Sequence, residues 1–252
     1  MLMENIKGYV QKRSFAQIKW QCLMIFIFAW VASPKASEQS DKHHAFELNK
    51  VASERWHLWR QTDALALYYQ EVEGTPLIEI KVQATLNSSL AGFLLFLQDY
   101  PMIPNWLDRA ESATLISQVS DTENLFITRF KSVWPVSKRE MIIRSRYWQN
   151  ADLSVELAVK DASHEVPIHG EIIRIKVIRS HWLLKPISNN RLQINHTILA
   201  DPKGNLPIWL VNQVSLRSMW ASLQAMQQQL PLSPWQSMGI PWIQEMKAKP
   251  TP

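Results

Sequence analysis

Residues 201–212 read Asp-Pro-Lys-Gly-Asn-Leu-Pro-Ile-Trp-Leu-Val-Asn, and no further proline or glycine occurs before Pro231. Asp-Pro-Lys-Gly predicts a tight turn, because proline fixes one backbone angle and glycine permits a positive φ. Asn205 can then act as a helix N-cap, with Pro207 in the first turn. The apolar residues that follow recur at helical steps: Leu210 and Val214, then Trp220, Leu223 and Met226. The sequence therefore predicts a strand, a sharp turn and a long amphipathic helix that packs back on a sheet.

Two segments together resemble the START family, the StAR-related lipid-transfer domains. Residues 201–212 are similar to the family's Asp-Pro-x-Gly-x-(Leu/Ile)-Pro-x-Trp-(Leu/Val)-Val-Asn pattern, which stands between a strand and the last long helix. Residues 128–140 are similar to a second segment, in which Trp-Pro precedes an arginine and an acidic residue and leads into a central strand. Here these residues are Trp134, Pro135, Arg139 and Glu140. The resemblance covers roughly residues 51–230.

The resemblance implies an α+β helix-grip (START-like) fold, in which a curved antiparallel sheet and a long C-terminal helix enclose a cavity. It also implies that the ligand is a lipid or another hydrophobic molecule. Neither segment carries catalytic residues, so the resemblance concerns fold and ligand class and names no reaction.

Residues 1–36 have the features of an export signal. Several basic residues precede an apolar run at 22–32, and small residues follow it. The run has 11 residues, whereas a membrane-spanning helix needs about 20. We therefore expect a signal peptide; an uncleaved inner-membrane anchor and a buried core segment are the alternatives. Residues 37–50 are polar and are expected to form a linker.

Charge and cysteine content narrow the function classes. The whole chain carries +5, but the first 36 residues hold five basic residues and one acidic residue, so the remainder is close to neutral. Nucleic-acid binding, which needs basic residues clustered on the folded domain, is therefore not expected. Cys22 is the only cysteine and lies in the expected leader, which excludes disulfides from the rest. An exported protein without disulfides fits a bacterial periplasm.

The body of the chain predicts one domain of order β-β-α-β₆-α. We expect a first helix at 53–60, a hairpin of 64–71 and 76–85, a helix at 90–97 capped by Ser89, and a short helical piece around Trp106. Six strands separated by turn signals follow, at 113–120, 124–134, 139–149, 154–160, 171–185 and 191–199. Short turns between successive strands indicate an antiparallel meander. Residues 231–252 are rich in proline and tryptophan and cannot continue the long helix. This tail is expected to pack on the domain, or else to lie near the cavity mouth or a membrane.

This arrangement of strands and helices can enclose a cavity. A sheet of about eight antiparallel strands coils because its strands are twisted, and its concave face has to be covered. A helix of about 26 residues spans roughly 39 Å and can cover it. Side chains then either fill the space or leave a tunnel. On the residues alone, a core filled by side chains remains a possible outcome. The resemblance favours a tunnel.

Alternation along two strands predicts which side chains face this space. Arg144 and Arg146 share one phase of 140–148, and Arg174 and Lys176 share one phase of 171–183, so the opposite phases are expected to point inward. With two helix residues, the predicted ligand-binding set is Met141, Ile143, Ser145, Tyr147, Ile173, Ile175, Val177, Leu210 and Val214. Arg179 or His181 would add a polar group. A mostly apolar wall with few polar groups suits an amphipathic ligand with a small head group.

Signatures of catalysis are lacking in the sequence. The seven histidines form no metal-binding spacing, and His164 and His169 are expected in a solvated loop. There is no Gly-x-Ser-x-Gly sequence, and no glycine-rich phosphate loop. Arg129, Arg139 and Glu140 are expected to form a structural ion pair, with contact to a ligand head group as the alternative.

We therefore predict a monomeric, non-enzymatic protein that binds a lipid or other hydrophobic molecule under its C-terminal helix, and the sequence leaves open whether it also transfers this ligand. We expect neither a cofactor nor a metal. We do expect transient contact with a membrane. An enzyme of the cyclase or hydrolase type working in the same kind of cavity is one alternative. A scaffold with a filled core is the other.

Overall fold

The computed structural model describes residues 55–132, 137–168, 170–188 and 190–246. The chain divides into residues 1–46 and 47–252, and every described residue belongs to the second unit. The predicted leader (1–36), the linker (37–50) and the Trp134-Pro135 pair lie outside the described residues. In the described part, no helix is both long and apolar enough to cross a membrane.

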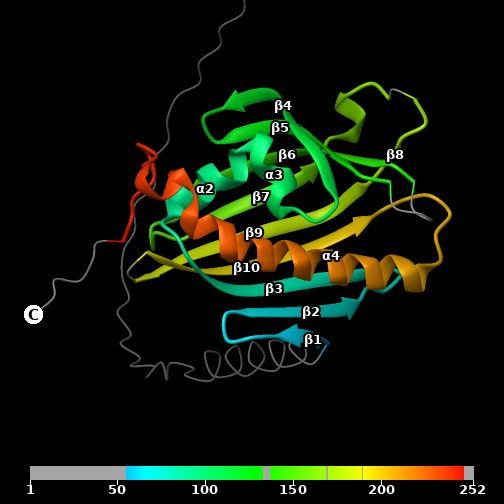
Figure 1. Cartoon of the computed structure of the whole chain (residues 1–252), viewed down its shortest axis with the longest axis horizontal. Coiled ribbons are helices and arrows are strands. Elements are labelled where there is room, and N and C mark those ends of the chain that lie inside the picture. The colour runs from blue at the N-terminus through cyan, green and yellow to red at the C-terminus, as the bar shows by residue number, and fades with distance from the viewer. Residues whose placement is uncertain (1–54, 133–136, 169, 189, 247–252) are drawn as a thin grey trace, which may run out of the picture. The chain divides into compact units, whose positions relative to one another are not determined.

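The described residues form a single curved sheet whose strands are almost all antiparallel (Figure 1). The strands are β1 (His57–Gln61), β2 (Leu65–Glu71), β3 (Ile78–Asn87), β4 (Ala110–Ser120), β5 (Glu123–Phe130), β6 (Arg139–Gln149), β7 (Val155–Asp161), β8 (Ile173–Arg174), β9 (Lys176–Ser188) and β10 (Arg191–Asp201). Their order is β1-β2-β3-β10-β9-β7-β6-β5-β4, and the short β8 pairs in parallel with β6. The predicted hairpin and meander are thus confirmed.

Helices cover one face of this sheet. They are α2 (Leu90–Gln98), α3 (Ile103–Trp106) and α4 (Ile208–Gln229), with short 3-10 turns η1 (Tyr100–Met102), η3 (Leu230–Leu232) and η4 (Pro234–Ser237). The 3-10 turn η2 (Ser163–Glu165) lies on the other face, where the neighbouring Ala162 and Val166 pack against Leu125, Ile127 and Ile142. Figure 1 shows α4 lying lengthwise across the sheet. Its apolar residues Trp220, Leu223 and Met226 are buried in one cluster with the inward side chains of the strands. The α+β helix-grip architecture expected from the sequence is therefore present.

The backbone before α4 tests two sequence predictions, the turn at Gly204 and the N-cap of the helix. Gly204 has φ +78°, as the predicted turn requires. A Cβ there would lie 3.0 Å from Ile173 Cδ1 and 3.3 Å from Arg139 Nη2, so only glycine fits without movement. The expected N-cap role of Asn205 is wrong. The helix begins at Ile208, and the Pro207 carbonyl accepts the backbone N–H groups of Leu210 and Val211 at 3.0 and 3.1 Å.

Arg139 connects the two segments that resemble START domains. Its side chain is buried, and its three nitrogens donate to the carbonyls of Ser137 (2.8 Å), Pro202 (3.1 Å) and Lys203 (3.1 Å). The start of β6 is thereby fixed to the turn that precedes α4. Glu140 beside it is also buried and accepts from Arg174 Nε at 2.8 Å, with Arg129 Nε at 3.7 Å. The expected ion pair is therefore confirmed for Arg129 and Glu140, with Arg174 as a further partner, whereas Arg139 takes no part in it.

The helix expected at 53–60 is wrong over its described part. His57–Gln61 instead form an edge strand that pairs with β2. Trp59 reaches under α4, where its ring centroid lies 6.2 Å from that of Trp220. A segment this short fits helical and extended periodicity about equally, so pairing with a neighbouring strand decides the outcome.

The C-terminal tail packs on the domain over its described residues. Ile240 and Ile243 are buried in the main core. Glu245 accepts the backbone N–H groups of Leu90 and Ala91 at 3.1 and 2.8 Å, at the N-terminus of α2. A carboxylate in this position satisfies free helix donors and complements the helix dipole. The tail is thus part of the described domain as far as residue 246.

Candidate functional site

Two adjoining cavities lie between α4 and the concave face of the sheet. The inner chamber has a volume of about 180 Å³ and the outer chamber about 260 Å³. Both are lined in part by Leu107, Met141, Ile198, Met219 and Ser222. These shared residues form the boundary between the chambers, and flexible methionines stand on both the sheet side and the helix side of it.

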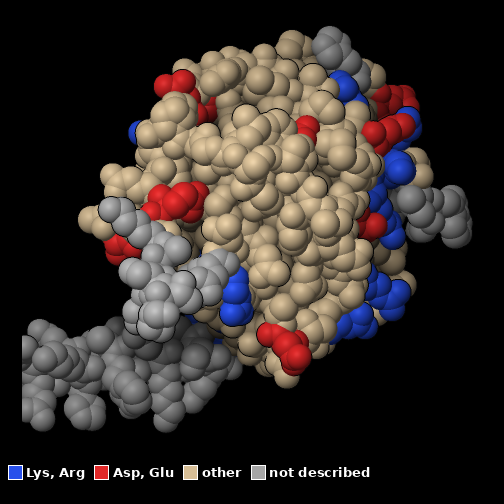
Figure 2. Space-filling view, turned by 60° about the vertical axis from the view of Figure 1, so that its left-hand side comes forward, with Lys and Arg blue, Asp and Glu red and all other residues tan. Residues whose placement is uncertain are grey.

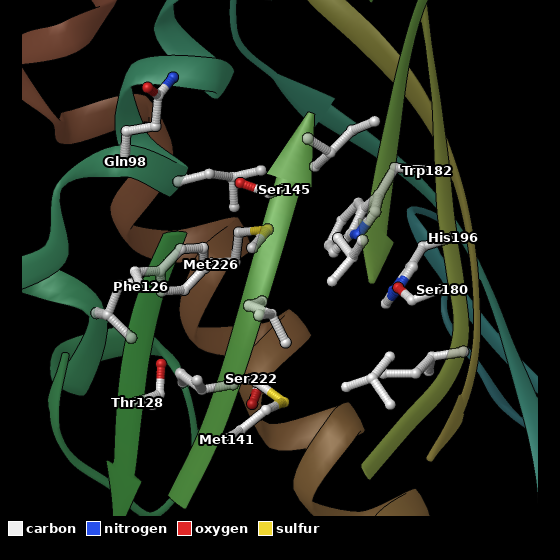
Figure 3. Close-up of a pocket in the computed structure, with 18 of the residues that line it drawn as sticks. Gln98, Phe126, Thr128, Met141, Ser145, Ser180, Trp182, His196, Ser222 and Met226 are labelled. Atoms are coloured by element: carbon white, nitrogen blue, oxygen red, sulfur yellow. The ribbon is translucent and has the colours of Figure 1, made fainter. Parts of the chain in front are cut away.

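The inner chamber is lined by residues of α2, the η1–α3 segment, α4 and five strands, some of which Figure 3 shows. Its lining is Leu94, Leu97, Gln98, Tyr100, Ile103, Trp106, Leu107, Asn124, Phe126, Thr128, Met141, Ile143, Ser145, Tyr147, Leu157, Val159, Val177, Ser180, Trp182, His196, Ile198, Met219, Ser222, Leu223 and Met226. This set contains no aspartate, glutamate, lysine or arginine. An apolar interior with a few neutral polar groups is what a site for a hydrophobic molecule requires.

The outer chamber lies beneath the first half of α4 and has a more polar lining. Alongside Leu210, Val211 and Val214 of α4 it includes Arg109, Lys131 and Arg139. All three nitrogens of Arg139 are occupied by backbone carbonyls, as described above. Arg109 Nε lies 3.5 Å from Asp108 Oδ2.

The segment at Asp108 ties the sheet side of the outer chamber to α4. Ser218 Oγ donates to Asp108 Oδ2 at 2.8 Å, and the Asp108 backbone N–H donates to Ser222 Oγ at 2.9 Å. Arg109 follows in a left-handed conformation with φ +62°. Two hydrogen bonds therefore hold the middle of α4 against the cavity wall.

Most of the predicted ligand-binding residues lie on these chambers. Met141, Ile143, Ser145 and Tyr147 line the inner chamber, so alternation along β6 placed the strand in the correct phase. Val177 also lines the inner chamber. Ile175, Leu210 and Val214 line the outer one.

Ile173 lines neither chamber. It belongs to β8, which leaves the path of β9 and pairs in parallel with β6 at Arg139. Its side chain lies instead against the turn at Gly204.

The expected inward position of Arg179 or His181 is wrong. Leu199 of β10 pairs with Arg179 and the next residue, Ala200, pairs with Val177, so Ile178 is an extra residue in β9. A bulge of this kind reverses the alternation beyond it. Arg179 accordingly bonds Glu79 at 2.7 Å and His181 bonds Glu156 at 2.9 Å, both on the outer face. Ser180 and Trp182 line the chamber in their place (Figure 3).

A buried Ser180–His196 pair stands on the wall made by β9 and β10. Ser180 Oγ lies 3.1 Å from His196 Nε2, and the imidazole stacks on Trp182 with ring centroids 3.7 Å apart. Burial lowers the pKa of His196 to about 3, so the ring is neutral at physiological pH. Its Nδ1 atom is buried and has no hydrogen-bond partner among the described residues.

A second group of polar side chains on the inner chamber is joined by hydrogen bonds, one of which comes from the tail. Asn124 Nδ2 donates to Gln98 Oε1 at 2.9 Å. Tyr147 OH donates to the Asp121 carbonyl at 3.2 Å and accepts from Trp242 Nε1 at 3.1 Å. Burial raises the pKa of the Tyr147 phenol, so it remains a neutral donor.

The described residues contain no group of histidines, cysteines and carboxylates able to hold a metal ion. The nearest approach to a catalytic arrangement is the Ser180–His196 pair. A histidine whose pKa has fallen to about 3 is a weak base, and no carboxylate orients its Nδ1 atom.

Comparisons with known proteins agree with this geometry. The family model described as START domain matches residues 39–235. A search of curated proteins gave no match. A STAR-related lipid transfer protein from Xanthomonas axonopodis is 23% identical with a TM-score of 0.64, over 70% of this chain and 99% of that chain.

Two human structures share the fold at lower identity. The lipid transfer and protein localization domain of StarD13 has a TM-score of 0.61 at 17% identity, over 76% of this chain and 98% of its own. Human STARD10 has a TM-score of 0.58 at 19% identity, over 81% of this chain and 88% of its own. Identities this low establish a common fold and leave the ligand to be argued from this chain's own residues.

Proposed function

Because this chain belongs to the START domain family, we propose that it binds a lipid or another hydrophobic molecule in the two chambers beneath α4. The observation that supports this most is the unfilled apolar space itself, about 180 Å³ within walls that carry no charged side chain. Burying about 400 Å² of apolar ligand surface would contribute about 10 kcal/mol before the entropy of association is subtracted. The binding would be non-covalent.

The helix α4 is proposed to act as the gate. Met219 and Ser222 of α4 line both chambers, so a displacement of this helix would open both at once. The hydrogen bonds of Asp108 to Ser218 and Ser222 would hold it closed. Release of these bonds near a bilayer would permit exchange of the ligand, which is the step that transfer requires.

The direct test is ligand uptake. The protein would be incubated with vesicles of mixed bacterial lipids, separated from them, and analysed by native mass spectrometry and by solvent extraction. We expect one hydrophobic molecule per chain. A protein that emerges empty, and also takes up no lipid from any vesicle, would count against ligand binding.

Transient membrane contact is proposed as part of this function. Figure 2 shows a broad central area without acidic or basic side chains on the side that lies at the left in Figure 1, away from the first turn of α4. At the first turn of α4, beside the outer chamber, Trp209 is 66% exposed and Ile208 is 38% exposed. Aromatic side chains of this kind favour the boundary between water and lipid. Flotation with vesicles should therefore recover the protein, and Trp209→Ser should reduce the recovery.

We further propose that the protein is exported to a bacterial periplasm, which rests on the charge pattern and apolar run of residues 1–36. Cell fractionation with N-terminal sequencing tests this. A cytoplasmic protein with an intact N-terminus would contradict it.

The proposed function includes no catalysis. The weak basicity of His196 and the lack of a carboxylate on its Nδ1 atom support this. Turnover of an ester substrate that is lost in Ser180→Ala would favour the enzymatic alternative.

A further inference from the structure

Four buried polar atoms in the described part of the chain have no hydrogen-bond partner. They are Tyr100 OH, Trp106 Nε1, Thr128 Oγ1 and His196 Nδ1. All four residues line the inner chamber. Their exposed fractions are 9%, 9%, 1% and 4%. Unpaired buried groups are rare in native proteins and each is unfavourable, so four around one cavity indicate a partner that the polypeptide does not supply.

The chemistry of these atoms defines that partner. A tryptophan N–H only donates, whereas tyrosine and threonine hydroxyls both donate and accept. Burial raises the pKa of Tyr100 to about 12 and lowers that of His196 to about 3, so both groups are neutral. With Nε2 of His196 engaged by Ser180, its Nδ1 atom is a donor or an acceptor according to the tautomer. The set therefore matches hydroxyl and carbonyl oxygens.

The positions of two of these groups show that they can engage one molecule from opposite sides. Thr128 lies on β5 and His196 on β10, on facing walls of the pocket in Figure 3. The rest of the lining is mostly apolar and includes Met141, Ile143 and Phe126. A ligand that spans the chamber would place its apolar body against these side chains.

An ionised head group would have no counterpart in the inner chamber. No charged side chain lines it. Of the three basic residues of the outer chamber, Arg139 is fully engaged by carbonyls, Arg109 is paired with Asp108, and Lys131 is exposed to solvent. Burial of an unpaired carboxylate or phosphate among apolar side chains is strongly unfavourable.

We propose that the inner chamber selects an uncharged, largely apolar molecule that carries hydroxyl or carbonyl oxygens, and that Thr128 and His196 are its polar contacts, assisted by Tyr100 and Trp106. This rests on the proposed function, because it assumes that the chamber is a ligand site. It extends that function by excluding ligands whose charge must enter the inner chamber. The apolar chain of such a ligand can pass between Met141 and Met219 into the outer chamber.

The test compares three probes with the same chain length and different ends. Oleyl alcohol, octadecene and oleate are each supplied in phosphatidylcholine vesicles at pH 8, and the amount bound per chain is measured by extraction and mass spectrometry. We expect the alcohol to bind about three- to tenfold more tightly than the hydrocarbon for each hydrogen bond formed. Oleate should bind at least about a hundredfold more weakly than the alcohol.

Two variants assign the polar contacts. Thr128→Val keeps the shape of the side chain and should lower alcohol binding about three- to tenfold without weakening octadecene. It should also raise the Tm of the empty protein by a few degrees, because a buried unpaired hydroxyl is removed. The double variant Ser180→Ala/His196→Phe retains a ring against Trp182 and should have the same selective effect. The matched control is Thr114→Val, at an exposed threonine of β4.

The outcomes separate this inference from the proposed function. Oleate or the vesicle phospholipid binding as tightly as the alcohol would overturn the inference and leave hydrophobic binding in place. An alcohol preference that both variants retain would also overturn it. Failure of every probe and of the vesicle lipid to bind would overturn both.

Discussion

Replacement of Ser145 by phenylalanine should fill the inner chamber and stabilise the empty protein. Ser145 lies in the middle of β6 and faces the chamber, whose volume is about 180 Å³. At about 24 cal/mol per Å³ of cavity, an empty space of this size destabilises the fold by roughly 4 kcal/mol. A buried phenylalanine side chain recovers about 1.5–3 kcal/mol of that. We therefore expect the free energy of unfolding of Ser145→Phe to rise by about 2 kcal/mol.

The same substitution should abolish ligand uptake, since the ring occupies the space that the ligand needs. Urea unfolding of lipid-free protein measures the stability change, and extraction after incubation with vesicles measures uptake. The control is Arg146→Phe, the next residue along β6, which is exposed. It should change stability by less than about 0.5 kcal/mol and leave uptake intact.

The sign of the change in the free energy of unfolding distinguishes an empty chamber from a filled one. If the chamber were already filled by side chains, an added ring would overpack the core and destabilise it by about 1–3 kcal/mol. Loss of stability in Ser145→Phe, or gain of stability with undiminished uptake, would refute the reasoning.

Three further predictions concern His196, Glu245 and Asp108. The pKa of His196 falls from 6.5 in the unfolded chain to about 3 in the folded protein. Between these two pH values only the unfolded chain binds the proton, so the free energy of unfolding decreases as the pH is lowered through this range. His196 should account for a decrease of about 2 kcal/mol in the free energy of unfolding between pH 7 and pH 5, measured by urea unfolding. This contribution should be absent in His196→Asn, and an unchanged pH dependence in that variant would contradict the assignment. Glu245→Ala removes the acceptor at the N-terminus of α2 and should lower the free energy of unfolding by about 1 kcal/mol, whereas no change would show that the tail does not stabilise the helix. Asp108→Ala removes the acceptor of Ser218 and should speed exchange of bound lipid between vesicles several-fold, measured with a fluorescent lipid; an unaltered rate would argue against α4 as the gate.

Local patterns were sufficient to predict the main elements. The turn at 202–204 and the helix after it follow from proline and glycine placement, and the phase of β6 follows from strict alternation along its length. The bounds predicted for β6, 139–149, are those of the structure. Elements with one strong periodicity and clear punctuation are the ones that sequence reasoning recovers.

The errors arose where tertiary contacts override local pattern. The alternation of the sequence continues through Ile178, so the bulge there could not be predicted from it. Because of this bulge, Ser180 and Trp182 line the cavity instead of Arg179 and His181. The segment at 57–61 became an edge strand because β2 offers it a partner.

The polar residues proposed to contact the ligand were missed altogether. His196 shares the inward phase of β10 with Leu192, Ile194 and Ile198, and a histidine in an otherwise apolar phase is a signal that could have been used. Tyr100 and Trp106 lie in a proline-interrupted helical segment without clear periodicity. Which of their atoms lack a partner depends on packing alone.

The central claim is that the space beneath α4 holds a ligand, and an experimental electron-density map of the protein purified from its native host tests it most directly. The account predicts continuous density for one elongated molecule in the inner chamber, with an oxygen within hydrogen-bond distance of Thr128 or His196. A map in which side chains from α4 and β6 close that space completely, with no molecule between them, would contradict it.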